Sequence, residues 1–417
     1  MTPLERLFAL EQFGIKLGLE NIRILLTALD HPEQAWRSIH IAGTNGKGSV
    51  AAMVERGLRA AGLHTGRYTS PHLNAIEERV ALNGMPVDSE TFAQVTAEVL
   101  SVVDDTLKVG TLTVTPTFFE VSTAIAFEIF RRANIDVAVV EVGLGGRFDA
   151  TNVLTPDITA ITSIAFDHER HLGRTLSAIA FEKAGIAKPG VPLVIGRLPA
   201  EAAKRIADVA AKVGAPLLDA HATTTDRVYP PLKLALAGRH QLENAAVAVA
   251  ILERWSAVVS DIPTEAIVTG LTQCDWPARL EWLRLPSGAE LLIDAAHNPA
   301  GAAALATYLE DNGLAPVPIV TSIMADKDVA GMVTQLRRVA SSFIATTVPH
   351  PRARTAEALA DAIREIAPGI PVVAEPSPDA AVVTATTGAP RAVAAGSIFL
   401  VGPLRARLLA AGATPRI

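Results

Sequence analysis

Short apolar runs alternate with amphipathic stretches along most of the chain. In its first part, this pattern predicts strands at residues 39–42, 66–69, 137–142, 158–163 and 193–195, and helices at 4–13, 19–29, 49–61, 89–103, 118–132, 176–187, 200–213, 241–255 and 264–272. Strands that alternate with helices in this way are typical of a mainly parallel sheet covered on both faces. Such sheets bind their ligands at the carboxyl ends of the strands.

A second series of the same kind follows the segment Trp276–Arg279. It predicts strands at 290–293, 319–322, 342–346, 372–374 and 397–401, and helices at 300–311, 329–339, 355–366, 379–386 and 404–411. We therefore expect an α/β protein with two domains. The first, residues 1–275, is a P-loop-type parallel-sheet domain, and the second, residues 276–417, is a smaller Rossmann-like domain.

The composition excludes several classes of protein. The 417 residues carry 37 Lys and Arg against 43 Asp and Glu, a net charge of −6, which argues against a nucleic-acid-binding protein. Cys274 is the only cysteine, so a disulfide framework is excluded and a reducing compartment is indicated. Because no signal peptide or apolar run of roughly 18 residues is present, we expect a cytoplasmic protein with no membrane partner.

The glycine-rich segment between residues 43 and 49 carries the strongest chemical signal. Gly43, Gly46 and Gly48 let the backbone turn tightly and direct N–H groups inward, Lys47 adds a positive charge, and the Ser49 hydroxyl can reach Mg²⁺. The sequence departs from the standard P-loop, which would need glycine at position 41 and Ser or Thr at position 48. The alternative, a plain strand-to-helix turn, does not require three glycines and a lysine.

Polar residues follow three other predicted strands at the same edge. Glu141 ends one strand and is a suitable ligand for Mg²⁺, which prefers oxygen donors. The alternative is that its charge is paired within the protein and binds no metal. The following glycines fail the dinucleotide fingerprint because position 148 is occupied by Phe. His168 is as compatible with a satisfied histidine as with a metal ligand. Ser70 lies in a Ser-Pro turn, which on spacing alone is the simpler interpretation.

The second domain offers its own candidates between a strand and a helix. Asp294 can bond a ribose hydroxyl or a substrate amine, and His297 lies beside it. The alternative is that Asn298 caps the helix while Asp294 and His297 are solvated. Arg279 is a candidate for stabilising phosphate charge, although a lone arginine between domains is usually structural.

These segments together closely resemble the folylpolyglutamate synthase/dihydrofolate synthase family of the Mur-type amide ligases. The resemblance covers most of the chain, and one departure is Ala278, where the family more often has glycine. The motifs that carry it, in chain order, are His40–Ser49, Thr69–Leu73, Phe118–Glu120, Glu141–Asn152, Asp167–His168, Glu182–Ile186, Asp294–Pro299, Asp326–Asp328 and Gly396–Ser397.

The resemblance implies roles for individual residues. It implies ATP contacts from Asn45, Gly46, Lys47, Gly48, Ser49, Asn244, Arg279 and Asp294, and Mg²⁺ ligation by Ser70, Glu141 and His168. It implies substrate contacts from Thr117, Phe118, Phe119, Glu120, Phe148, Asp149, Ala150, His297 and Ser397, the last two toward glutamate. Lys183 corresponds to the family's carbamylated lysine, in which CO₂ converts the amine into an anionic oxygen donor. The implied catalytic set is Lys47, Glu141, His168, Lys183, Asp294 and His297.

The implied reaction is the ATP-dependent joining of L-glutamate to dihydropteroate, to the glutamate tail of reduced folates, or to both, through an acyl phosphate. The implied cofactors are ATP and Mg²⁺, and we expect a monomer whose partners are small molecules. A folylpolyglutamate synthase without the second activity, and another Mur-type ligase, remain as alternatives. A P-loop kinase would leave the second domain unexplained, and a non-catalytic nucleotide-binding module would not release ADP in response to glutamate.

Overall fold

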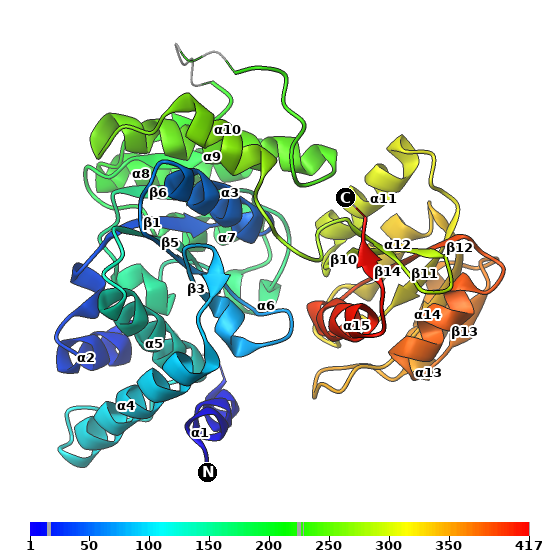
Figure 1. The fold of residues 1–417 in the computed structure, drawn as a ribbon, viewed down its shortest axis with the longest axis horizontal. Coiled ribbons are helices and arrows are strands. Elements are labelled where there is room, and N and C mark those ends of the chain that lie inside the picture. The colour runs from blue at the N-terminus through cyan, green and yellow to red at the C-terminus, as the bar shows by residue number, and fades with distance from the viewer. Residues whose placement is uncertain (15–17, 223–226, 228, 417) are drawn as a thin grey trace. The chain divides into compact units, whose positions relative to one another are not determined.

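The residues described by the structure, a computed structural model, are 1–14, 18–222, 227 and 229–416. Their contacts divide them into two compact units, each built on its own sheet (Figure 1). The first unit comprises Met1–Ala165, Glu169–Ala235 and Glu243–Cys274, and the second comprises Phe166–His168, Leu236–Leu242 and Asp275–Ile417. Two short segments that precede residue 275 in the sequence therefore group with the second unit.

The sheet of the first unit has eight strands among the described residues, in the order β4-β3-β2-β5-β1-β6-β7-β8. All are parallel except β3 and β4, which form an antiparallel edge. In the central pairs Ile41 lies opposite Glu141 and Ala42 opposite Ile161, so the chain leaves these strands at one edge. The strands are β1 (Arg37–Ala42), β2 (Thr65–Tyr68), β3 (Val80–Leu82), β4 (Met85–Pro86), β5 (Val137–Glu141), β6 (Ile158–Ile161), β7 (Leu193–Ile195) and β8 (Leu217–Asp219).

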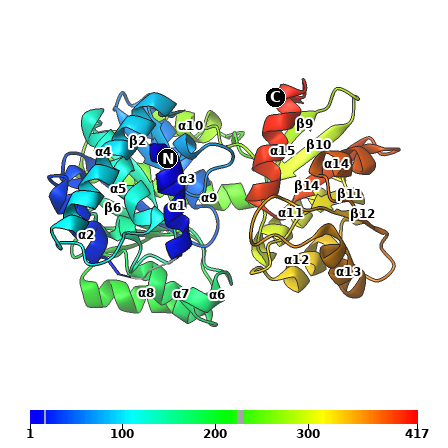
Figure 2. The same cartoon turned by 90° about the horizontal axis from the view of Figure 1, so that it is seen from below.

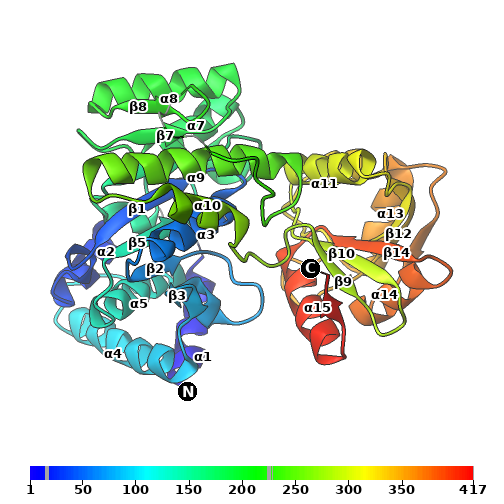
Figure 3. The same ribbon diagram turned by 45° about the horizontal axis from the view of Figure 1, so that its top comes forward.

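Helices cover this sheet through two apolar clusters and one close helix pair. The first cluster joins α1 (Pro3–Ala9), α2 (Glu20–Ala28), α4 (Ser89–Lys108) and α5 (Phe118–Arg132) to β2 and β5, and the second joins α7 (Leu176–Ala184) and α8 (Ala200–Val213) to β6 and β7. Helix α3 (Lys47–Ala60) packs against α10 (Thr264–Thr272) near α9 (Arg239–Val258) (Figure 3). A Cβ atom at Gly270 would collide with the Met53 carbonyl oxygen and crowd the Gly57 backbone, so glycine permits this close approach. The remaining short elements are α6 (Glu169–Leu172), η1 (Leu10–Phe13), η2 (Pro32–Gln34), η3 (Ile76–Arg79) and η4 (Ala150–Val153).

The second unit repeats this architecture on a smaller scale. In the part of the chain that the structure describes, its sheet has seven strands in the order β13-β12-β11-β14-β10-β9-β15, of which β9 and β15 are antiparallel to their neighbours. The strands are β9 (Glu281–Arg284), β10 (Glu290–Asp294), β11 (Val317–Thr321), β12 (Ala340–Ala345), β13 (Val372–Ala374), β14 (Arg391–Ala395) and β15 (Thr414–Pro415).

One apolar cluster holds three helices of this unit on a single face of its sheet. Helices α11 (Pro299–Asp311), α12 (Val329–Leu336) and α13 (Ala356–Ile366) contact one another in sequence and bury Leu292, Ile319 and Phe343 (Figure 2). Helices α14 (Pro378–Thr386) and α15 (Ile398–Ala410) also pack on the strands, α14 on β11 and α15 on β14.

The predicted strand at residues 397–401 is wrong, because these residues begin helix α15. The strand that precedes this helix is β14, whose alanine-rich sequence gives a weaker β signal than the run Ile398–Val401. Gly396, at a φ of 114°, ends the strand, and Ser397 then caps the helix by accepting the backbone N–H of Phe399. The sequence did not predict strands β3, β4, β8, β9, β14 and β15.

Candidate active site

The glycine-rich segment joins β1 to α3, which begins at Lys47. Gly43 and Gly46 have positive φ values of 151° and 87°, and a Cβ atom at either position would collide with a neighbouring side chain, Thr162 or Asn244. The Thr162 hydroxyl donates to the Asn45 carbonyl at 2.7 Å. The turn is therefore fixed in a shape that only glycine allows at two points, as a phosphate-binding loop requires.

Replacing Gly46 by Ala should therefore weaken ADP binding. The left-handed backbone would cost on the order of 1–3 kcal/mol, and the new methyl group would collide with Asn244, so the loop would change shape. We expect the dissociation constant for ADP, measured by calorimetry, to rise at least about tenfold. Gly62→Ala is the matched control, since Gly62 has a φ of 90° but an open surrounding. Equal effects of the two changes on ADP binding would contradict the prediction.

Three of the sequence-predicted residues come together around this turn. The Lys47 Nζ atom donates to the carbonyl oxygens of Gly43 and Thr44 at 3.2 and 3.3 Å and lies 3.6 Å from the Glu141 carboxylate. Lys183, which is 4% exposed, donates to the same Gly43 carbonyl at 2.9 Å. Two lysines and a carboxylate thus meet at the strand edge, where an anion with a divalent cation can be held.

The predicted magnesium ligands Ser70 and Glu141 are also close to each other. The backbone N–H of Ser70 donates to Glu141 Oε2 at 3.3 Å, and Glu141 is buried at the end of β5. A buried carboxylate beside a serine provides oxygen donors of the type that Mg²⁺ prefers, so these residues fit the ion. The third predicted ligand, His168, belongs to the second unit, and its role as a ligand stays a prediction. Across the described residues, no group of three or more His, Cys, Asp or Glu side chains is arranged to hold a metal.

The predicted substrate residues at the start of α5 have structural roles. Thr117 caps the helix and accepts the N–H of Glu120 at 3.3 Å, while the Glu120 carboxylate accepts the N–H of Thr117 at 2.7 Å. This reciprocal pair fixes the first turn of the helix. Both side chains are buried, at 5% and 4% exposure, so they stabilise the start of the helix from within. Their contact with substrate stays a prediction.

The predicted aromatic residues lie around the same helix end and the loop after β5. Phe118 packs under the Arg79 guanidinium, 5.0 Å from the ring centroid, and Phe119 lies 6.2 Å from Tyr68. A Cβ atom at Gly143 would collide with the Phe119 ring, so glycine lets this helix approach the loop.

A buried carboxylate, that of Asp149, stabilises the loop after β5. Asp149 accepts the N–H groups of Leu144 and Thr151, and burial raises the pKa of its carboxyl group above the usual value. Ala150 is buried beside it, and Phe148 is half-buried beneath the guanidinium of Arg147. Their contribution to substrate binding stays a prediction.

In the second unit, Asp294 ends β10 and is buried rather than solvated. Its two oxygens accept the N–H groups of Leu280 and Ala296 at 2.9 and 2.8 Å. Arg279 lies between two residues of positive φ, Ala278 at 56° and Leu280 at 49°. Glycine would adopt the conformation of Ala278 with less strain than alanine. The hydrogen bonds of Asp294 therefore stabilise the tight turn on which Arg279 lies.

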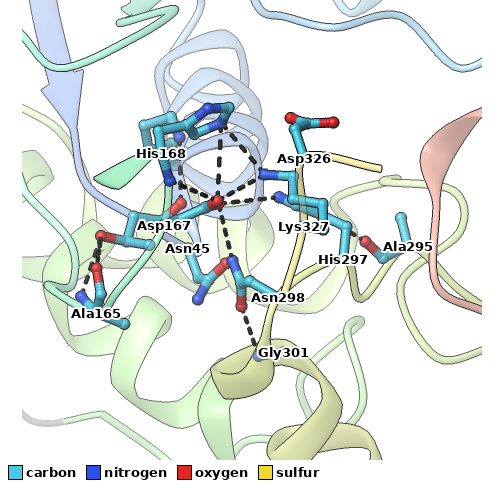
Figure 4. A network of polar contacts seen from close by, with 12 residues as sticks. Asn45, Ala165, Asp167, His168, Ala295, His297, Asn298, Gly301, Asp326 and Lys327 are labelled. Carbon is cyan, nitrogen blue, oxygen red and sulfur yellow. Dashed lines mark hydrogen bonds and ion pairs between the residues drawn. The ribbon is translucent and has the colours of Figure 1, made fainter. Parts of the chain in front are cut away.

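A cluster of polar side chains surrounds Asp167 in the second unit (Figure 4). Lys327 Nζ lies 2.6 Å from Asp167 Oδ1 and 3.3 Å from His168 Nε2, and His297 Nε2 lies 3.5 Å from Asp167 Oδ2. Burial opposes ionisation of Asp167, but the bond with His297 and the charge of Lys327 outweigh it and hold the pKa of this carboxyl far below its usual range. Lys327 lies in the motif Asp326–Asp328, but no role was predicted for it from the sequence.

Two further residues of this unit were predicted to face glutamate. Ser397 is buried at the start of α15, and the His297 ring is fixed on its other side by a 2.9 Å bond between Nδ1 and the Ala295 carbonyl. A residue that the sequence did not single out is His240, which is half-buried near Asp294 and Arg279. Burial lowers the pKa of its imidazole, and Arg279 adds to this effect while Asp294 opposes it.

Comparison with known proteins places this geometry in a family. Residues 278–402 match the family described as Mur ligase, glutamate ligase domain. A curated dihydrofolate synthase/folylpolyglutamate synthase of Mycobacterium tuberculosis is 38% identical, over 84% of this chain and 78% of its own length. The chain belongs to the folylpolyglutamate synthase/dihydrofolate synthase family. The resemblance inferred from the motifs is therefore confirmed.

Solved structures of this family confirm the predicted α/β fold as well. The chain is similar to M. tuberculosis folylpolyglutamate synthase complexed with ADP, with a TM-score of 0.90, 33% identity and 99% coverage of both chains. It is also similar to a bifunctional folylpolyglutamate synthase/dihydrofolate synthase with Mn, AMPPNP and L-glutamate bound, with a TM-score of 0.86, 31% identity and 98% coverage of both chains. No helix among the described residues is both long and apolar enough to cross a membrane.

Proposed function

We propose that the protein is an ATP-dependent ligase that joins L-glutamate to dihydropteroate and to the glutamate tail of reduced folates. The observation that carries this proposal is the meeting of Lys47, Lys183 and Glu141 around the Gly43 turn. Membership of the family supports glutamate ligation as the reaction at this phosphate-binding edge. A similar structure with AMPPNP, Mn and L-glutamate bound supports ATP, a divalent cation and glutamate as the ligands.

The chemistry begins with a carboxylate, which is a poor acyl donor until it is phosphorylated. We expect the N–H groups of Asn45 to Ser49, together with Lys47, to hold the ATP phosphates and to stabilise the charge that spreads during transfer. Ser70, Glu141 and His168 would hold Mg²⁺, which supplies positive charge to the phosphate oxygens when bound. Lys183, once carbamylated, would contribute a further anionic oxygen at this edge.

The second half of the reaction joins glutamate to the activated carboxyl group. Its α-amine displaces phosphate from the acyl phosphate, which forms the amide and releases ADP and phosphate overall. We assign nucleotide contacts to Asn244, Arg279 and Asp294, and glutamate contacts to His297 and Ser397. We assign the pterin-bearing substrate to the end of α5 and the loop after β5, from Phe118 and Phe119 to Phe148 and Ala150. Residues 1–275 would thus bind pterin and most of ATP, and residues 276–417 would bind glutamate and contribute Arg279 and Asp294 to the nucleotide.

The decisive experiment supplies labelled L-glutamate, ATP and Mg²⁺ with either dihydropteroate or tetrahydrofolate. We expect labelled product with both acceptors. Product with tetrahydrofolate alone would establish the single-activity alternative, and product with neither would overturn the proposal. ATP binding without glutamate-dependent ADP release would identify a nucleotide-binding module instead.

We also propose that the enzyme acts as a cytoplasmic monomer with small molecules as its partners. The negative net charge gives no basic footprint for nucleic acid, and the single thiol of Cys274 suits a reducing compartment. Light scattering coupled to size-exclusion chromatography should give the mass of one chain, 43.8 kDa. A mass of two chains would refute the monomer.

A further inference from the structure

Arg352 is a half-exposed cation in the second unit that has no part in the proposed function. It lies in the loop after β12, and 47% of its side chain is exposed. Among the described residues, its guanidinium makes one hydrogen bond, from Nη1 to Asp326 Oδ2 at 3.0 Å. Lys327, the neighbour of Asp326, is by contrast 10% exposed and held at 2.6 Å by Asp167. Arg352 therefore has N–H groups to offer to an anion.

The loop holds Arg352 in place before any ligand binds. Its carbonyl accepts the N–H of Ala325 at 2.8 Å, and its own N–H donates to His350 Nδ1 at 3.1 Å. The His350 ring stacks on Phe399 with centroids 4.1 Å apart, and Phe399 lies two residues after Ser397. The guanidinium itself lies 5.8 Å from the Phe399 ring. These contacts anchor Arg352 next to the first turn of α15.

The strand order places Arg352 to one side of the residues that take glutamate in the proposed function. His297 and Ser397, which take glutamate in the proposed function, follow the neighbouring strands β10 and β14. Arg352 follows β12, two strands beyond β14 on the side away from β10. With the reacting amine near His297, a side chain directed along the strand ends toward β12 would point to the side of the sheet on which Arg352 lies. Arginine suits a carboxylate at that position because its planar fork can donate two parallel hydrogen bonds.

We propose that Arg352 binds the side-chain carboxylate of the incoming L-glutamate and thereby selects glutamate over glutamine. This assignment rests on the proposed function, because it requires glutamate as the second substrate. Asp326 orients the guanidinium through one N–H and leaves the remaining donors for the ligand. An uncharged amide at the same place would leave the guanidinium partly unpaired, which is the basis of the selectivity.

The test compares Arg352→Gln with Asp326→Asn in the full-length enzyme, with glutamate or glutamine as the second substrate. For Arg352→Gln we expect the KM for glutamate to rise about 10- to 100-fold, as for a lost hydrogen bond between charged groups. The kcat and the KM for ATP should stay within about twofold, since neither depends on this contact. The preference for glutamate over glutamine should fall in proportion. Asp326→Asn, which keeps the guanidinium but no longer orients it, should raise the KM for glutamate by less than Arg352→Gln does.

Two results would overturn this assignment alone. One is an unchanged glutamate-to-glutamine preference in Arg352→Gln, and the other is an Asp326→Asn variant that reproduces the full defect, because Arg352 would then only brace the loop. Arg352→Lys, which keeps the charge without the fork, should fall between wild type and Arg352→Gln. Wild-type enzyme that releases no ADP with glutamate would overturn the proposed function and this assignment together. Thermal melting and ADP affinity serve as folding controls.

Discussion

Replacing Lys183 by Ala should lower kcat by about 100-fold or more, a loss comparable to removal of one charge-stabilising group from an active site. The side chain is buried, and its Nζ atom donates to the Gly43 carbonyl at 2.9 Å, so truncation removes a contact to the phosphate-binding turn. It also removes the amine that CO₂ would convert to a carbamate. Glutamate-dependent ADP release measures the loss.

Formate or acetate should restore part of the activity of Lys183→Ala, because either small anion can place a carboxylate oxygen in the space vacated by the carbamate. Lys212→Ala, on the exposed side of α8, is the matched control. Its kcat should equal that of the wild type, and formate or acetate should not raise it. A Lys183→Ala enzyme that is fully active would exclude Lys183 from the reaction. An impaired enzyme that no carboxylate rescues would argue against the carbamate.

Glu141→Gln should lower kcat by about 100- to 1,000-fold. The change keeps the shape of the side chain and its contact with the Ser70 N–H, but it removes the charge that lies 3.6 Å from Lys47 and that would hold Mg²⁺. We therefore also expect the Mg²⁺ concentration for half-maximal rate to increase. ADP release measured across a Mg²⁺ titration reports both effects.

The matched control for this second change is Glu90→Gln, at an exposed position in the first turn of α4. It should leave the Mg²⁺ titration unchanged. A Glu141→Gln variant with a normal rate and normal Mg²⁺ requirement would show that this carboxylate does not hold the ion.

Local sequence patterns predicted the long helices and the central strands well. The pattern placed α5, α8 and α10 at the boundaries that the structure has, since each has a clear apolar period and a defined start. The short strands β3, β4 and β15 were missed because two or three residues give no measurable period. The misplaced strand at 397–401 shows that an apolar run alone does not distinguish a strand from a buried helix start.

For the site, the rule that parallel strands end at one edge correctly suggested that Lys47 and Glu141 lie close together, although their chemical roles stay predictions. The sequence could not show that Thr117 and Glu120 cap a helix with each other. Nor could it show that Asp167 contacts Lys327, 160 residues away, because that contact depends on the folded chain. Contacts between distant segments leave no local period in the sequence.

Asn298 limits which residues its position can tolerate. Its Oδ1 atom accepts the N–H of Gly301 at 2.8 Å to cap α11, and its Nδ2 atom donates to Asp167 at 3.2 Å. Aspartate would cap the helix equally well but would place a second negative charge beside Asp167, and serine would cap without reaching it. Among the common capping residues only the amide meets both demands, so a mutational scan of helix starts should find this position far less permissive than Ser377 or Thr355, which cap α14 and α13.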